Sequence, residues 1–213
     1  MLIELKGWKK FIKNETLRAL NKKLIKIKNT IYKSPQEFSF LRSDNNKEIF
    51  KYLIKGRKKF QNVDNFLLIG TGGSSLGAKA IISLYEGKKI KFIENLDPST
   101  LNEFFLKNKN NILGLLIISK SGETLEILCL LDIIINNIKK KLDLISRTLI
   151  ITDKKKSTLR RLAEYYNIEV FDHDENIGGR FSCFSLTGLL PIHLVGINGI
   201  KLKKLVDKNF KKY

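Results

Sequence analysis

Two segments rich in glycine and hydroxyl residues contain the side chains best suited to binding an anion. Residues 70–77 read GTGGSSLG, and residues 119–124 read SKSGET. Glycine lets the backbone turn sharply and approach a ligand, while serine and threonine hydroxyls donate hydrogen bonds. Where such a segment also opens a helix, the free N–H groups of the first turn and the helix dipole favour negative charge. Both segments therefore indicate contacts with a phosphate group.

The first segment leaves other interpretations open. It lacks the Gly-Lys-Ser/Thr ending of a nucleoside-triphosphate P-loop. Gly70, Gly72 and Ser75 imitate the start of the dinucleotide pattern G-x-G-x-x-G, and Glu94 lies near the position where that pattern expects an acidic residue. Ser75 also suits the N-cap of a helix that follows a tight turn.

The second segment has three hydroxyls within one turn. Ser119, Ser121 and Thr124, together with backbone N–H groups, would form an uncharged cradle for a phosphate monoester. Hydroxyls without a metal ion suit a phosphate that is held rather than transferred. The competing interpretation is ordinary turn chemistry at a helix start.

A third segment carries an arginine next to two glycines. Residues 178–182 read GGRFS, which puts the permanent cation of Arg180 on a loop that can approach a ligand. Such an arginine can stabilise a developing oxyanion or hold a phosphate with two hydrogen bonds. A solvated arginine without a ligand is the alternative.

Short apolar runs precede these segments. The runs cover 66–69, 91–93, 113–118, 148–151 and 169–171, and most are followed by a polar turn and a helical pattern. Strands that alternate with helices indicate βαβ units and a parallel sheet covered on both faces. Ligands of such sheets bind beyond the carboxyl ends of the strands, where this chain has its Gly, Ser and Thr residues. The predicted fold class is therefore α/β.

The first part of the chain is predicted to be helical. Leu17, Leu20, Leu24, Ile27 and Ile31 recur at helical spacing. The Ser-Pro pair at 34–35 should end that helix. A second helix is expected within 44–56, so that helical structure precedes the sheet.

Composition excludes several classes of protein. The 213 residues have a formal net charge of +19, yet the basic residues are scattered in small clusters, so we do not expect a nucleic-acid partner. The most apolar stretch, 125–138, is interrupted by Glu126 and Asp132 and is too short to span a membrane. The first residues lack the apolar core and cleavage site of a signal peptide. A cytoplasmic protein is therefore predicted.

The cysteines and histidines give no sign of a metal site. Cys129 and Cys183 are far apart in apolar surroundings, fit no metal-ligand spacing and are expected to be buried free thiols. His173 lies near a predicted strand end, and His193 lies in an apolar stretch that suits a helix. We predict neither a metal nor another cofactor.

In combination these segments resemble the phosphoglucose isomerase family, in its short bacterial form. The resemblance covers about residues 50–205, and the GGRFS sequence is its most specific part. The segments that carry it are 69–77, 95–97, 118–124, 178–182, 188–191 and 196–198.

The resemblance implies a fold, a reaction and a set of site residues. The fold would be the doubly wound sugar isomerase (SIS) fold, a five-stranded parallel sheet flanked by helices. The reaction would be the interconversion of glucose 6-phosphate and fructose 6-phosphate through a cis-enediol, which serves glycolysis and gluconeogenesis. Ser119, Ser121 and Thr124 would bind the phosphate, Gly73 and Ser74 would line the sugar site, and Arg180 would steady the enediolate.

Part of the family's catalytic machinery has no counterpart in this sequence. The family's base, a glutamate, its ring-opening histidine and a C-terminal lysine lie in a second domain that we do not find before Tyr213. Glu123 and Glu126 lie near the second segment, but the resemblance does not make either of them the base. The sequence therefore predicts a fragment or truncated form, with a helical segment at 1–55, an SIS domain at 56–200 and the start of a C-terminal half at 201–213.

Other assemblies and functions remain open at this point. The family implies a homodimer, and mannose 6-phosphate is a further conceivable substrate. A non-catalytic SIS module that senses a sugar phosphate would use the same sheet and the same hydroxyls, but would have no evident need for Arg180.

Overall fold

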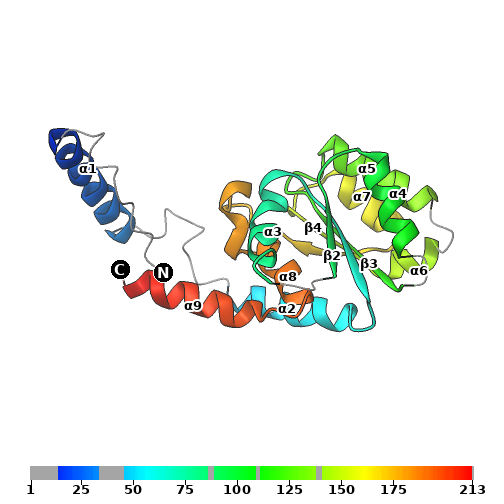
Figure 1. Ribbon diagram of the computed structural model, residues 1–213. Helices are drawn as coiled ribbons and strands as arrows, with labels where there is room; N and C mark the ends of the chain where they lie inside the picture. The colour runs from blue at the N-terminus through cyan, green and yellow to red at the C-terminus, as the bar shows by residue number, and fades with distance from the viewer. Residues whose placement is uncertain (1–13, 34–45, 86–88, 109–110, 138–140, 213) are drawn as a thin grey trace. The chain divides into compact units, whose positions relative to one another are not determined.

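The structure is a computed structural model that describes residues 14–33, 46–85, 89–108, 111–137 and 141–212 (Figure 1). The chain divides into two compact units, 1–42 and 43–213. In the first unit the described part is one helix, α1 (Asn14–Lys33). The second unit contains the sheet and every candidate site residue.

Strands and helices alternate through most of the second unit. Its strands are β1 (Asn65–Ile69), β2 (Ile90–Ile93), β3 (Leu113–Ile118), β4 (Thr148–Thr152) and β5 (Glu169–Asp172). Its α-helices are α2 (Asn46–Lys59), α3 (Leu76–Ile82), α4 (Pro98–Lys107), α5 (Leu125–Asn137), α6 (Lys141–Ser146), α7 (Thr158–Tyr165), α8 (Leu186–Leu194) and α9 (Gly199–Lys212). Two 3₁₀ helices, η4 (Gly72–Ser74) and η5 (Gly179–Phe184), lie near the ends of strands.

Within the described residues the strands form one parallel sheet of five, in the order β2-β1-β3-β4-β5. The register pairs Ile69 with Ile117 across β1 and β3, and Ile118 with Ile151 across β3 and β4. The central strands therefore end at nearly the same level. The turns after β1, β3 and β4 begin side by side at the carboxyl edge of the sheet.

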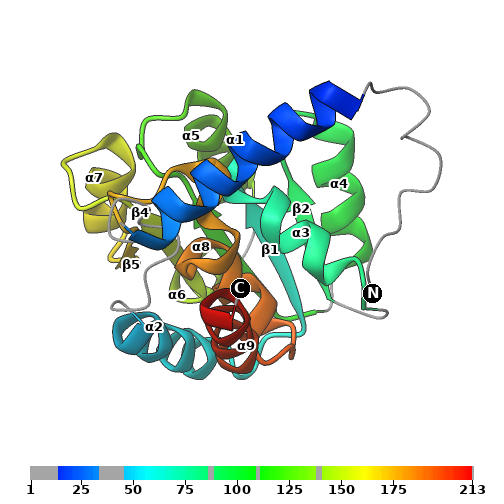
Figure 2. The same cartoon turned by 90° about the vertical axis from the view of Figure 1, so that its left-hand side faces the viewer.

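The strands are apolar throughout because both faces of the sheet are covered. Leu67, Leu115 and Ile117 face one layer of helices, α4 to α7, while Leu68, Leu116 and Ile118 face the other, formed mainly by α2 and α8. Figures 1 and 2 show these two layers on opposite sides of the strands. Helix α3 joins the second layer through Ala78 and Ile82, which pack against Ile192.

The predicted architecture is confirmed. Each of the five predicted strands is present, and the two N-terminal helices are α1 and α2. The predicted helix end at Ser34-Pro35 lies outside the described residues. The functional boundaries at residues 55 and 200 stay a prediction. Among the described helices, none is both long and apolar enough to cross a membrane.

Candidate functional site

The turn between β3 and α5 contains the three predicted hydroxyl residues and brings two of their hydroxyls together. The hydroxyls of Ser119 and Thr124 lie 3.0 Å apart, within hydrogen-bonding distance. Ser119 Oγ also accepts the Gly122 N–H at 3.2 Å, and Ser121 Oγ accepts the Glu123 N–H at 3.2 Å. Ser119 is buried, Thr124 half-buried and Ser121 exposed, so the three hydroxyls lead from the sheet edge toward solvent.

The conformation of this turn depends on Gly122. Its φ is +67°, in the left-handed region that glycine enters without strain. A Cβ on Gly122 would lie under 3.0 Å from Ser157, at the start of α7, and would also meet the Thr152 hydroxyl at 3.0 Å. The close approach of the turn to the end of β4 therefore requires a residue without a side chain.

The charged side chains of the same turn reach toward its neighbours. Lys120 Nζ donates to the backbone carbonyls of Glu175 and Ile177, each at 2.9 Å. Glu123 Oε1 accepts the Thr158 N–H of α7 at 2.6 Å. Hydrogen bonding to Thr158, mainly from this backbone N–H, holds the pKa of the Glu123 carboxyl below its ordinary value. Glu123 thus secures the start of a helix, which is a structural role.

The turn after β1 is organised around backbone contacts. Gly73 lies in η4, and a Cβ on it would fall under 3.0 Å from the carbonyl of Gly179. Ser74 is half-buried in the same 3₁₀ helix. Ser75 is at the N-cap position of α3, but its side chain makes no capping hydrogen bond.

The Ser75 hydroxyl bonds to Glu94 instead. Ser75 is fully buried, and its Oγ donates to Glu94 Oε1 at 2.6 Å, while Lys79 Nζ pairs with Glu94 Oε2. Burial alone would raise the pKa of Glu94, but the hydrogen bonds from Lys79 and Ser75 outweigh burial and lower it. The acidic residue that imitated a dinucleotide pattern is therefore occupied in a contact between the end of β2 and the start of α3.

The Gly-Gly-Arg segment forms the start of η5 and lies against the first turn. Ser182 Oγ is 3.0 Å from the carbonyl oxygen of Gly73 and 2.6 Å from that of Gly179. On the other side, the Lys120 ammonium holds the segment that leads into Gly178. Arg180 is exposed, and within the described part of the chain its guanidinium has no ion-pair partner. The fold therefore ties the backbone around Arg180 to both hydroxyl-rich turns.

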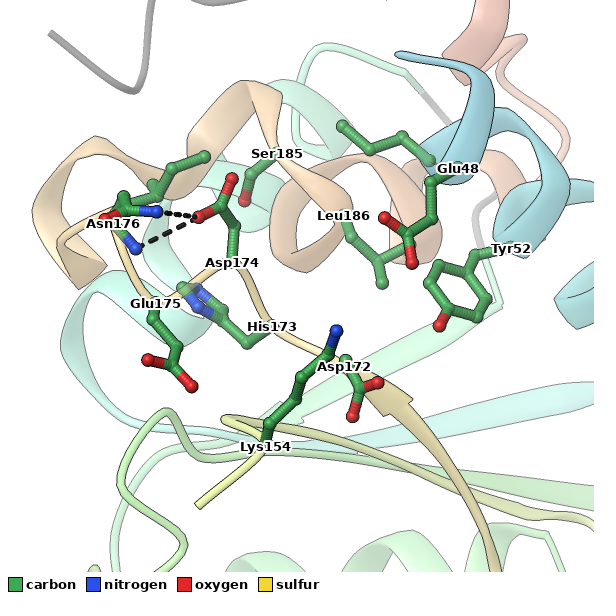
Figure 3. A pocket seen from close by; sticks show the side chains of 12 residues that line it. Glu48, Tyr52, Lys154, Asp172, His173, Asp174, Glu175, Asn176, Ser185 and Leu186 are labelled. Carbon is green, nitrogen blue, oxygen red and sulfur yellow. Dashed lines mark hydrogen bonds between the residues drawn. The ribbon is translucent and has the colours of Figure 1, made fainter. Parts of the chain in front are cut away.

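A cavity of about 340 Å³ lies on the α2 side of the segment that follows β5 (Figure 3). Its lining residues are Glu48, Ile49, Tyr52, Lys154, Asp172, His173, Asp174, Glu175, Asn176, Ile177, Ser185 and Leu186. Figure 3 shows many carboxylates around it, and the hydroxyls of the β3–α5 turn are not among its lining groups. Lys154 is the one lysine or arginine among the described residues of this lining, and because Ser119, Ser121 and Thr124 are absent from it, the cavity and the hydroxyl cradle are different sites.

His173 is buried at the bottom of this region. Its Nδ1 lies 3.3 Å from Asp153 Oδ1, and among the described residues neither atom forms a hydrogen bond. Burial lowers the pKa of His173, Asp153 raises it in part, and Lys120 lowers it further. His173 is therefore a neutral imidazole near pH 7, and we assign it no catalytic role.

His193 and Glu126 both lie in helices. The prediction of a helical position for His193 is confirmed, since it lies in α8. Its carbonyl accepts a hydrogen bond from Arg57, and its Nδ1 accepts the Gly199 N–H at 3.3 Å. Glu126 is exposed in the first turn of α5.

The cysteines are free, as predicted, but the prediction that both are buried is wrong. Cys129 and Cys183 are each half-buried. Cys129 lies beside the buried face of α5, and Cys183 lies in η5 near the surface, against Gly77. The remaining burial still raises the pKa of the Cys183 thiol. Among the described residues no group of three or more His, Cys, Asp or Glu side chains could hold a metal ion.

Two outward-reaching residues of the β3–α5 turn were not predicted from the sequence. Lys120 and Glu123 contact segments that are 55 and 35 residues away along the chain. No local pattern encodes such partners. The only signal was the presence of two opposite charges in a turn whose other residues suit an uncharged site.

Comparison with known proteins agrees with this arrangement. The phosphoglucose isomerase family model matches residues 42–210. A probable glucose-6-phosphate isomerase of Methanococcus maripaludis is 33% identical over 156 residues, which cover 69% of this chain and 34% of that protein. A glucose-6-phosphate isomerase of Clostridium tetani is 31% identical, over 92% of this chain and 49% of that protein.

A solved structure shows the same fold. The crystal structure of a hypothetical protein of Thermus thermophilus superposes with a TM-score of 0.72 at 23% identity, covering 91% of this chain and 49% of that one. This chain thus spans between 34% and 49% of the lengths of these three proteins. From the family match over 42–210 and from its fold, the chain belongs to the phosphoglucose isomerase family.

Proposed function

We propose that this chain is the phosphate-binding and enediolate-stabilising part of a glucose-6-phosphate isomerase. The whole protein would interconvert glucose 6-phosphate and fructose 6-phosphate. The proposal rests above all on one observation: the hydroxyls of Ser119 and Thr124 meet at the carboxyl edge of the sheet, 3.0 Å apart, with Ser121 in the same turn.

The cradle suits a phosphate monoester for electrostatic reasons. The first N–H groups of α5 have no acceptor within the helix, and the helix dipole makes this end attractive to an anion. Hydroxyl hydrogens can rotate toward phosphate oxygens. The formal charge of +19 draws anionic substrates toward the protein. The cradle would bind the phosphate without reacting with it, which fixes the position of the sugar carbons.

Arg180 supplies the second requirement of the reaction. Moving a proton between C1 and C2 of the sugar passes through an enediolate, whose oxygen carries negative charge. A permanent cation placed before the reaction begins stabilises that charge. Arg180 is exposed on a segment anchored against η4, the location of Gly73 and Ser74. These two residues would then line the sugar between the phosphate and the arginine.

The proton transfer also needs a base and an acid. Glu123 is occupied with the N–H of α7, and His173 is buried and neutral. We therefore expect this polypeptide by itself to bind sugar phosphates weakly and to turn them over slowly or not at all.

Calorimetric titration of the full 213-residue chain with fructose 6-phosphate tests the proposal. Ser119→Ala and Thr124→Val should each weaken binding about tenfold, the loss expected for one hydrogen bond to a charged group. Ser83→Ala is the matched control, because its hydroxyl bonds to the backbone carbonyl of Ala80 in α3, away from the cradle. Equal affinities for all three variants and the unchanged chain would contradict the proposal.

Arg180 distinguishes an isomerase from a module that only senses sugar phosphate. Arg180→Ala should leave the affinity for fructose 6-phosphate within about threefold in either case, since the arginine acts on the sugar end. In a protein that includes the rest of the family's catalytic domain, the same change should remove most of the turnover rate. Unchanged turnover would favour the sensing module.

A further inference from the structure

Lys120, like Glu123, is a residue of the β3–α5 turn whose side chain reaches a segment outside the turn. Its neighbours Ser119 and Ser121 keep their hydroxyls within the turn, but the Lys120 ammonium lies 2.9 Å from two carbonyl oxygens of another segment, those of Glu175 and Ile177. A charged donor that bridges two carbonyls makes stronger hydrogen bonds than a neutral donor. The side chain is half-buried, so water competes for these bonds only in part.

The segment that Lys120 holds is itself a compact turn. Asp174 Oδ1 accepts the Asn176 N–H at 3.0 Å, and the Ile177 N–H bonds to the Asp174 carbonyl at 3.1 Å. Figure 3 shows this turn between His173 and η5, with the Asp174–Asn176 hydrogen bonds drawn. Because the turn is closed by its own hydrogen bonds, the ammonium fixes it as one body.

Arg180 follows this turn after two glycines. A Cβ on Gly179 would meet nothing within 4 Å, and one on Gly178 would touch only Phe181. The glycines therefore offer no side chain that could place the arginine, although the Gly179 backbone itself lies against Gly73. The anchors lie on either side of it: Lys120 holds Ile177 before it, and Ser182 is hydrogen-bonded to Gly73 after it.

We propose that Lys120 is a positioning residue that couples the phosphate-binding turn to Arg180. Its ammonium fixes the carbonyls of Glu175 and Ile177, and through them the backbone that presents the guanidinium. Lys120 would thus keep the arginine at a set distance from the phosphate cradle. The inference rests on the proposed function, since it assigns Arg180 to the carbon end of the same substrate.

The test compares two ligands that differ only at the end that Arg180 would contact. Glucitol 6-phosphate has a neutral C1 end, and 6-phosphogluconate has a carboxylate there. The affinity ratio is the affinity for 6-phosphogluconate divided by that for glucitol 6-phosphate. Measured by calorimetry on the full chain, it reports the contribution of the arginine. Inorganic phosphate measures the cradle alone.

The variants separate positioning from charge. Lys120→Met should lower the affinity ratio about tenfold, because Arg180 would no longer be held where it contacts the carboxylate. The same change should leave the affinity for inorganic phosphate within about threefold. Lys120→Arg, whose fork can donate to two carbonyls, should restore most of the ratio. In the Arg180→Ala background, Lys120→Met should change the ratio no further. Lys156→Met, which removes the same charge from an exposed loop residue, should leave the ratio unchanged.

Each other outcome overturns a specific statement. If Arg180→Ala lowers the ratio but Lys120→Met does not, Lys120 has no positioning role. If Lys120→Met lowers the ratio equally without the arginine, or Lys156→Met lowers it as much, the effect is one of charge and the proposal fails. Should Lys120→Met not fold, Lys120→Gln replaces it, with a smaller loss expected from its single amide donor. If the unchanged chain binds none of the three ligands, the proposed function itself is wrong, and this inference falls with it.

Discussion

The turns after β1 and β3 look alike in sequence but are built differently. Both follow a buried parallel strand, contain glycine and serine, and lead into a helix. The turn after β1 is fixed by close backbone packing, with Gly73 against Gly179, and its buried Ser75 hydroxyl is taken up by Glu94. The turn after β3 keeps the Ser119 and Thr124 hydroxyls together and is fixed through the long side chains of Lys120 and Glu123.

The difference shows how two turns of one site can have different roles, one in spacing the segments and the other in contacting the ligand. A turn held by backbone packing tolerates no added atoms, so it can set the distance between two segments. In a turn held by charged side chains that reach other segments, the hydroxyls bond only within the turn, and a ligand could replace those local hydrogen bonds. Composition alone does not distinguish these cases, because the distinction depends on partners far away in sequence.

The largest expected effect is on the packed turn. Gly73→Ala should lower the free energy of unfolding by about 3 kcal/mol, because its Cβ would collide with the backbone of Gly179, which cannot move aside as a side chain could. Gly179→Ala is the matched control, since its Cβ would meet nothing within 4 Å, and it should change that free energy by less than about 0.5 kcal/mol. Urea unfolding measures both. Similar values for the two variants would show that backbone packing does not fix the first turn.

A smaller loss is expected at the glycine of the second turn. Gly122→Ala should cost about 2 kcal/mol of unfolding free energy, from the left-handed φ of +67° and the contact with the Ser157 hydroxyl. Since that hydroxyl is the end of a side chain, Ser157→Ala should relieve part of the loss in the double variant. A loss that Ser157→Ala does not relieve at all would place the cost in the backbone and in the contact with the Ser157 Cβ, which alanine keeps.

Serine variants should separate folding from binding in the two turns. Ser75→Ala should lower the unfolding free energy by about 1 kcal/mol, because it removes a buried hydrogen bond to Glu94, and leave phosphate affinity within about twofold. Ser121→Ala, at an exposed position, should change stability by less than about 0.5 kcal/mol and weaken phosphate binding severalfold. Denaturation and calorimetry on the same samples measure both. The reverse pattern would exchange the roles of the turns.

The smallest effect concerns pH. Burial lowers the pKa of His173 in the folded chain, so the unfolded chain takes up the proton first as the pH falls. The unfolding free energy should therefore decline below about pH 6.5, the ordinary histidine value, and His173→Asn should reduce that decline. Because the charge of Lys120 contributes to lowering this pKa, Lys120→Met should raise the pKa seen in an NMR titration of His173. Ser75→Ala, in the other turn, should leave the His173 titration unchanged.

The fold was predictable because its signals are local. Runs such as 113–118 and 148–151 are short, apolar and followed by turn residues, and they are β3 and β4 of the parallel sheet. The contact between the Ser119 and Thr124 hydroxyls also follows from local spacing, since both residues belong to one turn. The family resemblance added Gly73 and Ser74 as residues that would line the sugar, and it gave Arg180, already a candidate from its own segment, the role of steadying the enediolate.

The connections between the segments were not predictable. The sequence suggested Ser75 as a helix cap, which would accept a hydrogen bond from a helix N–H. Its hydroxyl instead donates to the Glu94 carboxylate at the end of β2, because a hydrogen bond to a charged group is stronger than one between neutral groups. Glu123 finds its partner after β4, and Lys120 finds its partners after β5, only when the sheet order places β4 and then β5 beyond β3. Such contacts form only in the assembled sheet, so local sequence patterns do not predict them.

A crystal structure of the full chain with 6-phosphogluconate bound would show whether the β3–α5 turn holds the phosphate. We expect phosphate oxygens within hydrogen-bonding distance, about 3 Å, of Ser119, Ser121 and Thr124, with the carboxylate directed toward Arg180. A phosphate bound instead in the cavity beside His173, or against the turn after β1 alone, would contradict this expectation.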